Sequence, residues 1–349
     1  MRKTWDWLFF TQILALGAIS LLVIFSINKT NFHSQLIFWV IGLVVFFFAS
    51  AFDFRNWQKL ALPLYVISLI ALVSLLFLAN PVRGSVRWID LGFFRLQPSE
   101  IAKVASILLL SNFYLEKSAK ELKNVALSLI MVLPAFALVL IEPDIGNAIT
   151  FLAIWFGISA AAGFRIKHIF TLFALAAIFI VFFYELLAPY QKERIAAFIN
   201  PASDPLRTGY NVIQSKIAVG SGMFWGRGLG RGTQSQLNFL PEATSDFIFA
   251  SIAEQLGFFG ATILIGIFYW LVVKILGFTK DATRYGQLIL VGVISFLIIQ
   301  SLVNIGMNMG LLPVTGITLP LISSGGSSLI STLFLLGIVL NVVKNSSLL

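Results

Sequence analysis

Three groups of charged residues stand where apolar segments of this chain begin or end. Asp246 closes a polar stretch and leads into a long apolar run. Glu100 and Lys103 lie three residues apart at the start of another run, so on a helix they share one face and neutralise each other. Glu142 and Asp144 flank a proline between two further runs. A carboxylate in such a place can act as a general base, and a cation can bind a developing negative charge.

Each group also has a purely structural explanation. Glu100 and Lys103 can simply steady a helix end, with Lys103 close enough to the helix start to extend outward to the interface. Asp144 and the Thr-Ser-Asp cluster at 244–246 are suitable helix N-caps. Capping does not explain Glu142, because negative charge is disfavoured at the end of a helix.

Asp246 is followed at spacings of four by Ala250 and Glu254, which places the three residues on one stripe of a helix. Ser251 and Gln255 lie beside this stripe. Acidic residues facing lipid are costly, so we expect the stripe to line a cavity or to contact another helix.

The segments that must position these residues are strongly apolar. Of 349 residues, 58% are hydrophobic and 11% charged, and the mean hydropathy is +0.94. Apolar runs of about 18 to 25 residues without a short alternating pattern select spanning helices over a β-barrel. We therefore expect an all-α polytopic membrane protein with ten transmembrane helices. The runs lie at 8–27, 33–52, 57–79, 98–115, 123–141, 144–163, 166–187, 247–275, 285–308 and 319–343.

The charges predict the orientation of these spans. Lys and Arg are more numerous in the short segments on one side, which places both termini in the cytoplasm and a large loop, about 188–246, outside. We expect residues 1–349 to form a single integral membrane domain. The outer segments favour Arg, which suits anionic groups, although loop solvation and contact with lipid headgroups explain this equally well. The net charge of +9 is divided between the two sides, so nucleic acid is not an expected partner.

Other patterns exclude common kinds of site. The glycine-rich run at 220–232 lacks the Gly-Lys-Ser/Thr ending of a P-loop. His33 and His168 are expected on opposite sides of the membrane, and the chain has no cysteine. The segment 304–329 is rich in Pro, Gly and Ser, which predicts an irregular passage that lines a cavity.

Five stretches together resemble one family. They are RWIDLGFFRLQPSEIAK (87–103), EPDIGNA (142–148), YQKERIAAFINP (190–201), LPEATSDFIF (240–249) and NIGMNMGLLPVTGITLPLISSGGSS (304–328). In this order they are similar to the SEDS proteins (shape, elongation, division and sporulation), bacterial peptidoglycan glycosyltransferases. RGTQSQLNFLPE and GLLPVTG are more similar to the elongation branch, RodA, than to the division branch, FtsW. The chain departs from the family pattern at Thr244, Ser245, Gln255 and Ser324.

The resemblance implies an inverting enzyme of the bacterial cytoplasmic membrane that polymerises lipid II into β-1,4 glycan strands on the outer face during elongation. It implies undecaprenyl pyrophosphate as the leaving group and a class B penicillin-binding protein as partner, besides membrane lipids. Asp246 is the candidate general base. The candidate substrate-binding residues are Glu100, Lys103, Asp144, Glu142, Arg87, Trp88, Arg194 and Lys216. Among these, Lys103, Arg87, Arg194 and Lys216 are candidates for binding the pyrophosphate, and Trp88 for packing on a sugar or on the lipid interface.

Other interpretations remain open at this point. A helix N-terminus would lower the pKa of Asp246, whereas nearby carboxylates would raise it. The acidic cluster could instead hold a divalent cation, Mg²⁺ or Mn²⁺. A flippase for the same lipid, or a scaffold for a cell-wall synthase, would have similar spans.

Overall fold

The structure is a computed structural model that describes residues 6–52, 54–78, 87–90, 92, 94–165, 192, 196, 198–201, 205 and 209–345. These residues are mostly α-helical, as the apolar runs predict. The helices are α1 (Trp7–Ile27), α2 (Lys29–Ala51), α3 (Phe54–Leu78), α4 (Pro98–Glu116), α5 (Leu122–Ile141), α6 (Ile145–Ala161), α9 (Tyr210–Ser221), α10 (Thr233–Gln236), α11 (Ile248–Phe278), α12 (Arg284–Asn308) and α13 (Gly326–Asn345). Strands β1 (Ile89–Asp90) and β2 (Arg95–Leu96) pair antiparallel, with Ile89 opposite Leu96.

Seven of the described helices are long and apolar enough to cross a membrane, and α6 is a shorter apolar helix. Apart from the seventh and the last, each expected span coincides with a helix to within a few residues. The seventh, 166–187, lies outside the described residues. The protein is therefore an all-α polytopic membrane protein.

The predicted start of the last span, at residue 319, is wrong. Helix α13 begins at Gly326, and the chain from 313 to 325 is non-helical. The reason is that main-chain groups of this segment are bound by other parts of the protein; for example, the N–H of Ser324 donates to the carbonyl of Thr244 at 2.8 Å. The expectation of an irregular passage is confirmed for this segment.

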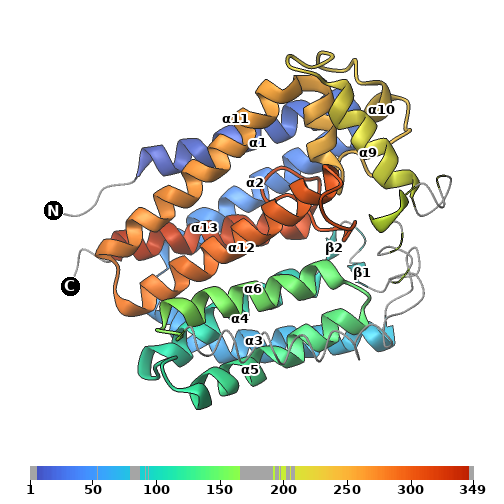
Figure 1. Ribbon diagram of the computed structural model, residues 1–349. Helices are drawn as coiled ribbons and strands as arrows, with labels where there is room; N and C mark the ends of the chain where they lie inside the picture. The colour runs from blue at the N-terminus through green and yellow to red at the C-terminus, as the bar shows by residue number, and fades with distance from the viewer. Residues whose placement is uncertain are drawn as a thin grey trace.

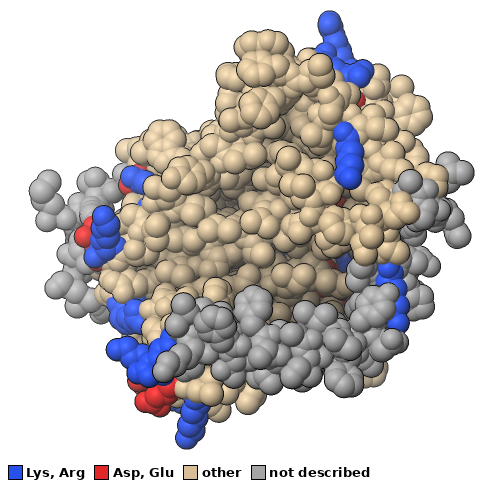
Figure 2. Space-filling view, in the orientation of Figure 1, with Lys and Arg blue, Asp and Glu red and all other residues tan. Residues whose placement is uncertain are grey.

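Helix α12 lies at the centre of the bundle, between α11 and α13 on one side and α4 and α6 on the other (Figure 1). The start of α1 and the end of α13 lie at one end of the bundle, and β1, β2, α9 and α10 lie at the opposite end. Lys and Arg side chains gather toward the ends of the helices, and the middle of the visible face is largely uncharged (Figure 2). This distribution is expected of helices whose long axes cross a bilayer.

Helix α11 is interrupted at Gly257, where φ is 67° and ψ is −167°. The main-chain groups released by the break are bound by the segment that follows α9. The N–H groups of Phe258 and Phe259 donate to the carbonyls of Met223 and Phe224 at 2.8 and 3.1 Å. Non-helical backbone in a membrane protein requires such internal partners. The break thereby joins the segment after α9 to the helix that follows Asp246.

Replacing Gly257 by alanine should destabilise the protein. A Cβ at this position would lie 2.3 Å from the nitrogen of Gly226, and the positive φ alone costs a residue with a side chain about 1–3 kcal/mol. Thermal unfolding in detergent measures the effect. Gly266→Ala is the matched control, because it lies in the same helix and its Cβ would meet no atom within 4 Å. Equal melting temperatures for the two variants would contradict the prediction.

Candidate active site

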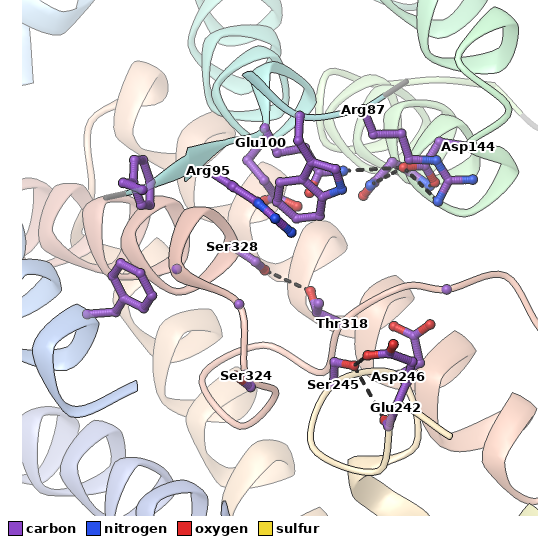
Figure 3. Close-up of a pocket in the computed structure, with 18 of the residues that line it drawn as sticks. Arg87, Arg95, Glu100, Asp144, Glu242, Ser245, Asp246, Thr318, Ser324 and Ser328 are labelled. Atoms are coloured by element: carbon purple, nitrogen blue, oxygen red, sulfur yellow. Dashed lines mark hydrogen bonds and ion pairs between the residues drawn. The ribbon is translucent and has the colours of Figure 1, made fainter. Parts of the chain in front are cut away.

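A cavity of about 650 Å³ lies at the end of the molecule that carries β1 and β2 (Figure 3). Its wall combines segments that are far apart in the sequence: the β1–β2 hairpin, the first turns of α4 and α6, the turn before α11 and the irregular segment before α13. The charged residues that line it are Arg87, Arg95, Glu100, Asp144, Glu242 and Asp246. The fold thus brings together cationic and acidic groups that the sequence placed only on the same side of the membrane.

Arg87 is fixed on one wall, beside the start of α6. Its Nη1 lies 3.7 Å from Asp144 Oδ2, and its Nε donates to the carbonyl of Glu142 at 3.3 Å. Its Nη2 donates to the carbonyl of Pro143. Asp144 caps α6 as predicted, because its Oδ1 accepts from the N–H of Asn147 at 3.1 Å. The guanidinium is therefore held in place by a carboxylate and two carbonyls.

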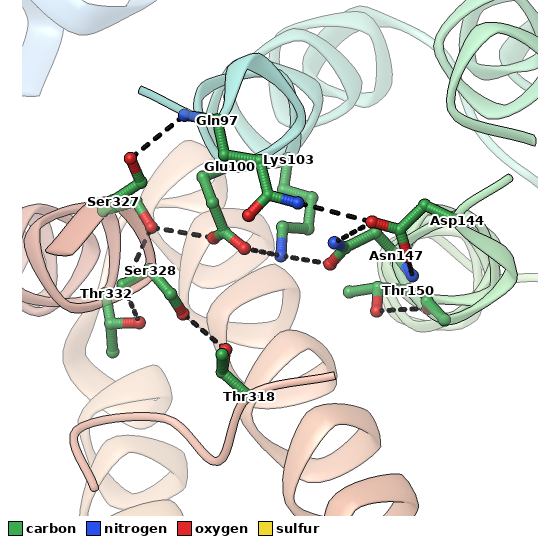
Figure 4. Close-up of polar contacts among 12 residues, drawn as sticks. Gln97, Glu100, Lys103, Asp144, Asn147, Thr150, Thr318, Ser327, Ser328 and Thr332 are labelled. Carbon is green, nitrogen blue, oxygen red and sulfur yellow. Dashed lines mark hydrogen bonds and ion pairs between the residues drawn. The ribbon is translucent and has the colours of Figure 1, made fainter. Parts of the chain in front are cut away.

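Glu100 and Lys103 form a buried ion pair behind this wall (Figure 4). Lys103 Nζ lies 2.8 Å from Glu100 Oε1 and donates to Asn147 Oδ1 at 2.8 Å. The second oxygen of Glu100 accepts from Ser331 at 2.9 Å, and Asn147 Nδ2 donates to Asp144 at 2.9 Å. The predicted pairing is confirmed. Lys103 does not extend outward, although its position would have allowed it, because its fully buried ammonium has two buried acceptors.

Asp246 lies on the opposite wall of the cavity, in the turn before α11 (Figure 3). Glu242 belongs to the same turn, and its Oε2 accepts from the Ser245 hydroxyl at 2.9 Å. Gly316 separates this wall from Arg87: a Cβ there would lie 3.5 Å from Asp246 Oδ2 and 3.9 Å from Arg87 Nη1. Its φ of 76° favours glycine, so no side chain from this position lies between the two groups. A carboxylate and a guanidinium therefore face each other across one glycine.

The predicted N-cap at 244–246 is wrong. Helix α11 begins at Ile248, and Phe247 occupies the N-cap position without a side-chain hydrogen bond. The turn is shaped instead by contacts with other elements. Asn304 and Asn308 of α12 both donate to the carbonyl of Asp246, at 3.0 and 2.9 Å. The Asp246 carboxylate lies at the cavity rather than at a helix end.

Other predicted residues differ in their placement. Trp88 lines the cavity next to Arg87. Lys216 is exposed on α9 and packs against Gly310, and it does not line this cavity. Arg194 lies outside the described residues.

Glu254 binds a neighbouring segment and does not line the cavity. Its fully buried carboxylate accepts from the N–H groups of Gln234 and Ser235 at 2.8 and 3.1 Å and from the Ser235 hydroxyl at 2.8 Å. The neighbouring Gln255 Oε1 accepts from Ser26 of α1 at 2.6 Å. Glu254 therefore contacts another segment, as expected, and holds α10 against α11. The expected helical stripe does not include Asp246, because α11 begins at Ile248.

The pKa of Glu142 is raised from its ordinary value of 4.5 to about 8, mainly because the carboxyl is buried. The charge of Asp144 adds to this rise, and the charge of Arg87 opposes it. Its side-chain Oε1 is buried without a hydrogen-bond partner among the described residues. Folded Glu142 thus keeps its proton near neutral pH.

The stability of the protein should consequently fall as the pH rises from about 5 to about 8, since in this range folded Glu142 keeps a proton that the unfolded chain has released. Glu142→Gln should weaken this dependence and be relatively more stable toward pH 8. Melting temperatures of both proteins across the range test the prediction, with each protein compared to itself at pH 5. Parallel curves would contradict it.

Several polar residues of the site are not among the candidates that the sequence predicted. Gln97 donates to Asp144 Oδ2 at 3.3 Å, and the hydroxyls of Thr318 and Ser328 lie 2.8 Å apart. Gln97 is adjacent to the Pro-Ser-Glu stretch that contains Glu100, so the sequence could have indicated it as a site residue. For Thr318 and Ser328 the sequence indicated only that polar residues lie in an irregular segment.

The described residues do not fit a divalent-cation site. They contain no group of three or more His, Cys, Asp or Glu residues that could hold a metal ion. Glu100 is bound by Lys103, and Asp144 is bound by Arg87 and Asn147, so protein cations and amides already occupy these carboxylates.

Comparison with known proteins identifies the family. A family model described as "Cell cycle protein", covering FtsW, RodA and SpoVE, matches residues 5–348. The peptidoglycan glycosyltransferase MrdB of Escherichia coli K12 is 38% identical over 86% of this chain and 82% of its own length. A probable peptidoglycan glycosyltransferase FtsW of Trichlorobacter lovleyi is 35% identical over 97% of this chain and 93% of its own length. MrdB is a RodA protein, so both the RodA and the FtsW branches are among the relatives.

Solved structures agree with this assignment. The fold matches a chain from a study of polymerization and crosslinking by a peptidoglycan synthase complex, with a TM-score of 0.86, 30% identity and 99% of both chains covered. It also matches the crystal structure of the rod shape determining protein RodA of Thermus thermophilus, with a TM-score of 0.75, 28% identity and 98% of both chains covered. The chain belongs to the SEDS family of peptidoglycan glycosyltransferases.

Proposed function

We propose that this protein polymerises lipid II into β-1,4 glycan strands at the cavity, with Asp246 as general base and undecaprenyl pyrophosphate as leaving group. The observation that carries the proposal is the placement of Asp246 and Arg87 on either side of Gly316. A base is needed at the attacking hydroxyl and a cation at the departing phosphate. An inverting transfer needs these two groups on opposite sides of the sugar carbon.

In the proposed step, the sugar hydroxyl of the acceptor loses its proton to Asp246 as its oxygen bonds to the anomeric carbon of the donor. The bond between that carbon and the pyrophosphate oxygen breaks, and its electron pair leaves with the pyrophosphate. Arg87 stabilises the negative charge that develops there. Arg95 also lines the cavity and is exposed, so it can contact the same anion.

The remaining candidates receive different roles. Glu100 and Asp144 line the cavity, whereas Lys103 is fully buried and acts through Glu100 and Asn147. We assign Trp88, which lines the cavity, to packing on a sugar ring. We assign Glu142 to holding Arg87 in place, since its carbonyl accepts from Arg87 Nε. Lys216 and Arg194 remain candidates for contact with a second part of the substrate.

The lipid part of the substrate also has a suitable environment. An apolar cavity of about 360 Å³ lies between α3, α4 and α13, and Phe94 and Glu100 line both it and the polar cavity. A prenyl chain in the apolar cavity would place its pyrophosphate near the polar one. This arrangement fits a substrate that is anchored in the membrane.

We further propose ten spans in one integral membrane domain, residues 1–349, with both termini in the cytoplasm and the loop 188–246 outside. We assign the protein to elongation on the residues RGTQSQLNFLPE and GLLPVTG. A class B penicillin-binding protein is the proposed partner, and the similarity to a chain described with a peptidoglycan synthase complex supports it.

The test is to reconstitute the protein with its partner in liposomes and to supply labelled lipid II. We expect glycan strands of many disaccharides and release of undecaprenyl pyrophosphate. A flippase would instead move intact lipid II between leaflets without polymer, and a scaffold would do neither. Glu254, the acid that the sequence offered for a transport path, instead binds α10 among the described residues.

A further inference from the structure

The turn that carries Asp246 is bound along its main chain by other parts of the protein. Every carbonyl from 242 to 246 accepts at least one hydrogen bond. The Glu242 carbonyl accepts from the N–H groups of Ser245 and Phe247, and the Ala243 carbonyl accepts from Ser251 Oγ. The carbonyls of Thr244 and Ser245 accept from the N–H of Ser324 and from Ser323 Oγ. The Asp246 carbonyl accepts from Nδ2 of both Asn304 and Asn308. The conformation of the turn is therefore set mainly from outside.

Two asparagines of α12 hold the carbonyl of the candidate base itself. Asn304 and Asn308 are both 0% exposed, although they lie in a long apolar helix. Asn308 also accepts from the N–H of Ala250, at 2.9 Å, so it binds both the turn and the first turn of α11. A buried amide in an apolar helix is costly unless its donors and acceptors are satisfied, and here the partners belong to the active-site turn.

Asn304 connects the turn that carries Asp246 to the segment that carries Gly316. Its Nδ2 donates to the carbonyl of Asp246 at 3.0 Å and to the carbonyl of Ile317 at 2.7 Å. Ile317 directly follows Gly316, the residue that separates the Asp246 carboxylate from the Arg87 guanidinium. One amide group thus fixes the distance between the main chain of Asp246 and the segment at Gly316, which lies next to Arg87.

We propose that Asn304 and Asn308 are positioning residues for the glycosyl transfer, which hold Asp246 in register with Gly316 and Arg87. The proposal rests on the function proposed above. Neither asparagine lines the cavity, so neither contacts the substrate. Their loss should therefore reduce the rate of the chemical step and leave substrate binding almost unchanged.

The experiment compares Asn304→Leu with Asn341→Leu in the complete complex. Asn341 is a matched control: it is 1% exposed, lies in α13, and its Nδ2 donates to two carbonyls, Ser50 at 2.9 Å and Phe52 at 2.7 Å. Both changes remove an equally buried amide with two main-chain acceptors. Only Asn304 binds the active-site turn.

We expect Asn304→Leu to lower kcat for lipid II polymerisation by about 10²-fold, the effect of a displacement near 1 Å, with KM nearly unchanged. Asn341→Leu should lower the melting temperature by a similar amount and keep its kcat. Should Asn304→Leu fail to fold, Asn304→Ser keeps one donor and should give an intermediate kcat, and Asn308→Leu tests the second amide.

A kcat for Asn304→Leu that equals that of Asn341→Leu, or a loss confined to KM, would overturn the proposal. Asp246→Ala separates this failure from failure of the proposed function. If Asp246→Ala is inactive while Asn304→Leu keeps its kcat, only the positioning role is lost. If Asp246→Ala polymerises normally, the general-base assignment is lost as well.

Discussion

Asp246→Ala and Asp246→Asn should each lower the rate of glycan polymerisation by about 10²–10⁴-fold, the usual contribution of a general base. A sugar hydroxyl is a weak nucleophile, and in the cavity Asp246 is the carboxylate that faces Arg87 across Gly316. Initial rates with labelled lipid II, measured on the purified complex, give the effect. The variants should fold, because the turn is held through its main-chain carbonyls, which both substitutions keep.

Glu242 provides the control for this prediction. It lies in the same turn and lines the same cavity, so Glu242→Gln removes a similar charge at a similar place. We expect a clearly smaller loss for Glu242→Gln than for Asp246→Asn. The opposite order would transfer the role of base to Glu242.

Local features of the site could be predicted from the sequence. The Asp144 cap and the Glu100–Lys103 pair each join residues three positions apart, and both were predicted correctly. Helix geometry alone places such residues together, so no knowledge of tertiary structure is required. The helices could be predicted from the lengths of the apolar runs, which likewise requires no knowledge of tertiary structure.

The long-range features could not be predicted in this way. The capping interpretation of Asp246 is wrong because Asn304 and Asn308, 58 and 62 positions away, bind its carbonyl. The start of α13 was placed too early because apolar residues of 319–325 were counted toward a helix, whereas this segment binds the active-site turn through Ser323 and Ser324. In both places a tertiary contact overrides a local preference.

Lys103 is buried because of tertiary contacts as well, and its replacement should have a large effect on stability. Lys103→Met should destabilise the protein by about 3–5 kcal/mol, because it leaves the buried Glu100 carboxylate without its cation. Asn147 also loses its ammonium donor. Unfolding in detergent at pH 7 measures the change, and glycan polymerisation should fall in parallel with the folded fraction.

The double variant Glu100→Gln/Lys103→Met distinguishes pairing from packing. Methionine fills much of the volume of the lysine stem, and glutamine can still accept from Ser331, which now donates to Glu100 at 2.9 Å. If the cost of Lys103→Met comes from an unpaired charge, removing that charge should restore most of the lost stability. Equal stability of the single and double variants would mean that Lys103 matters through its packing under Phe296, whose ring centre lies 5.2 Å from Nζ. Because Glu100 lines the cavity and Lys103 does not, restored stability without restored polymerisation would further assign the charge of Glu100 to the reaction.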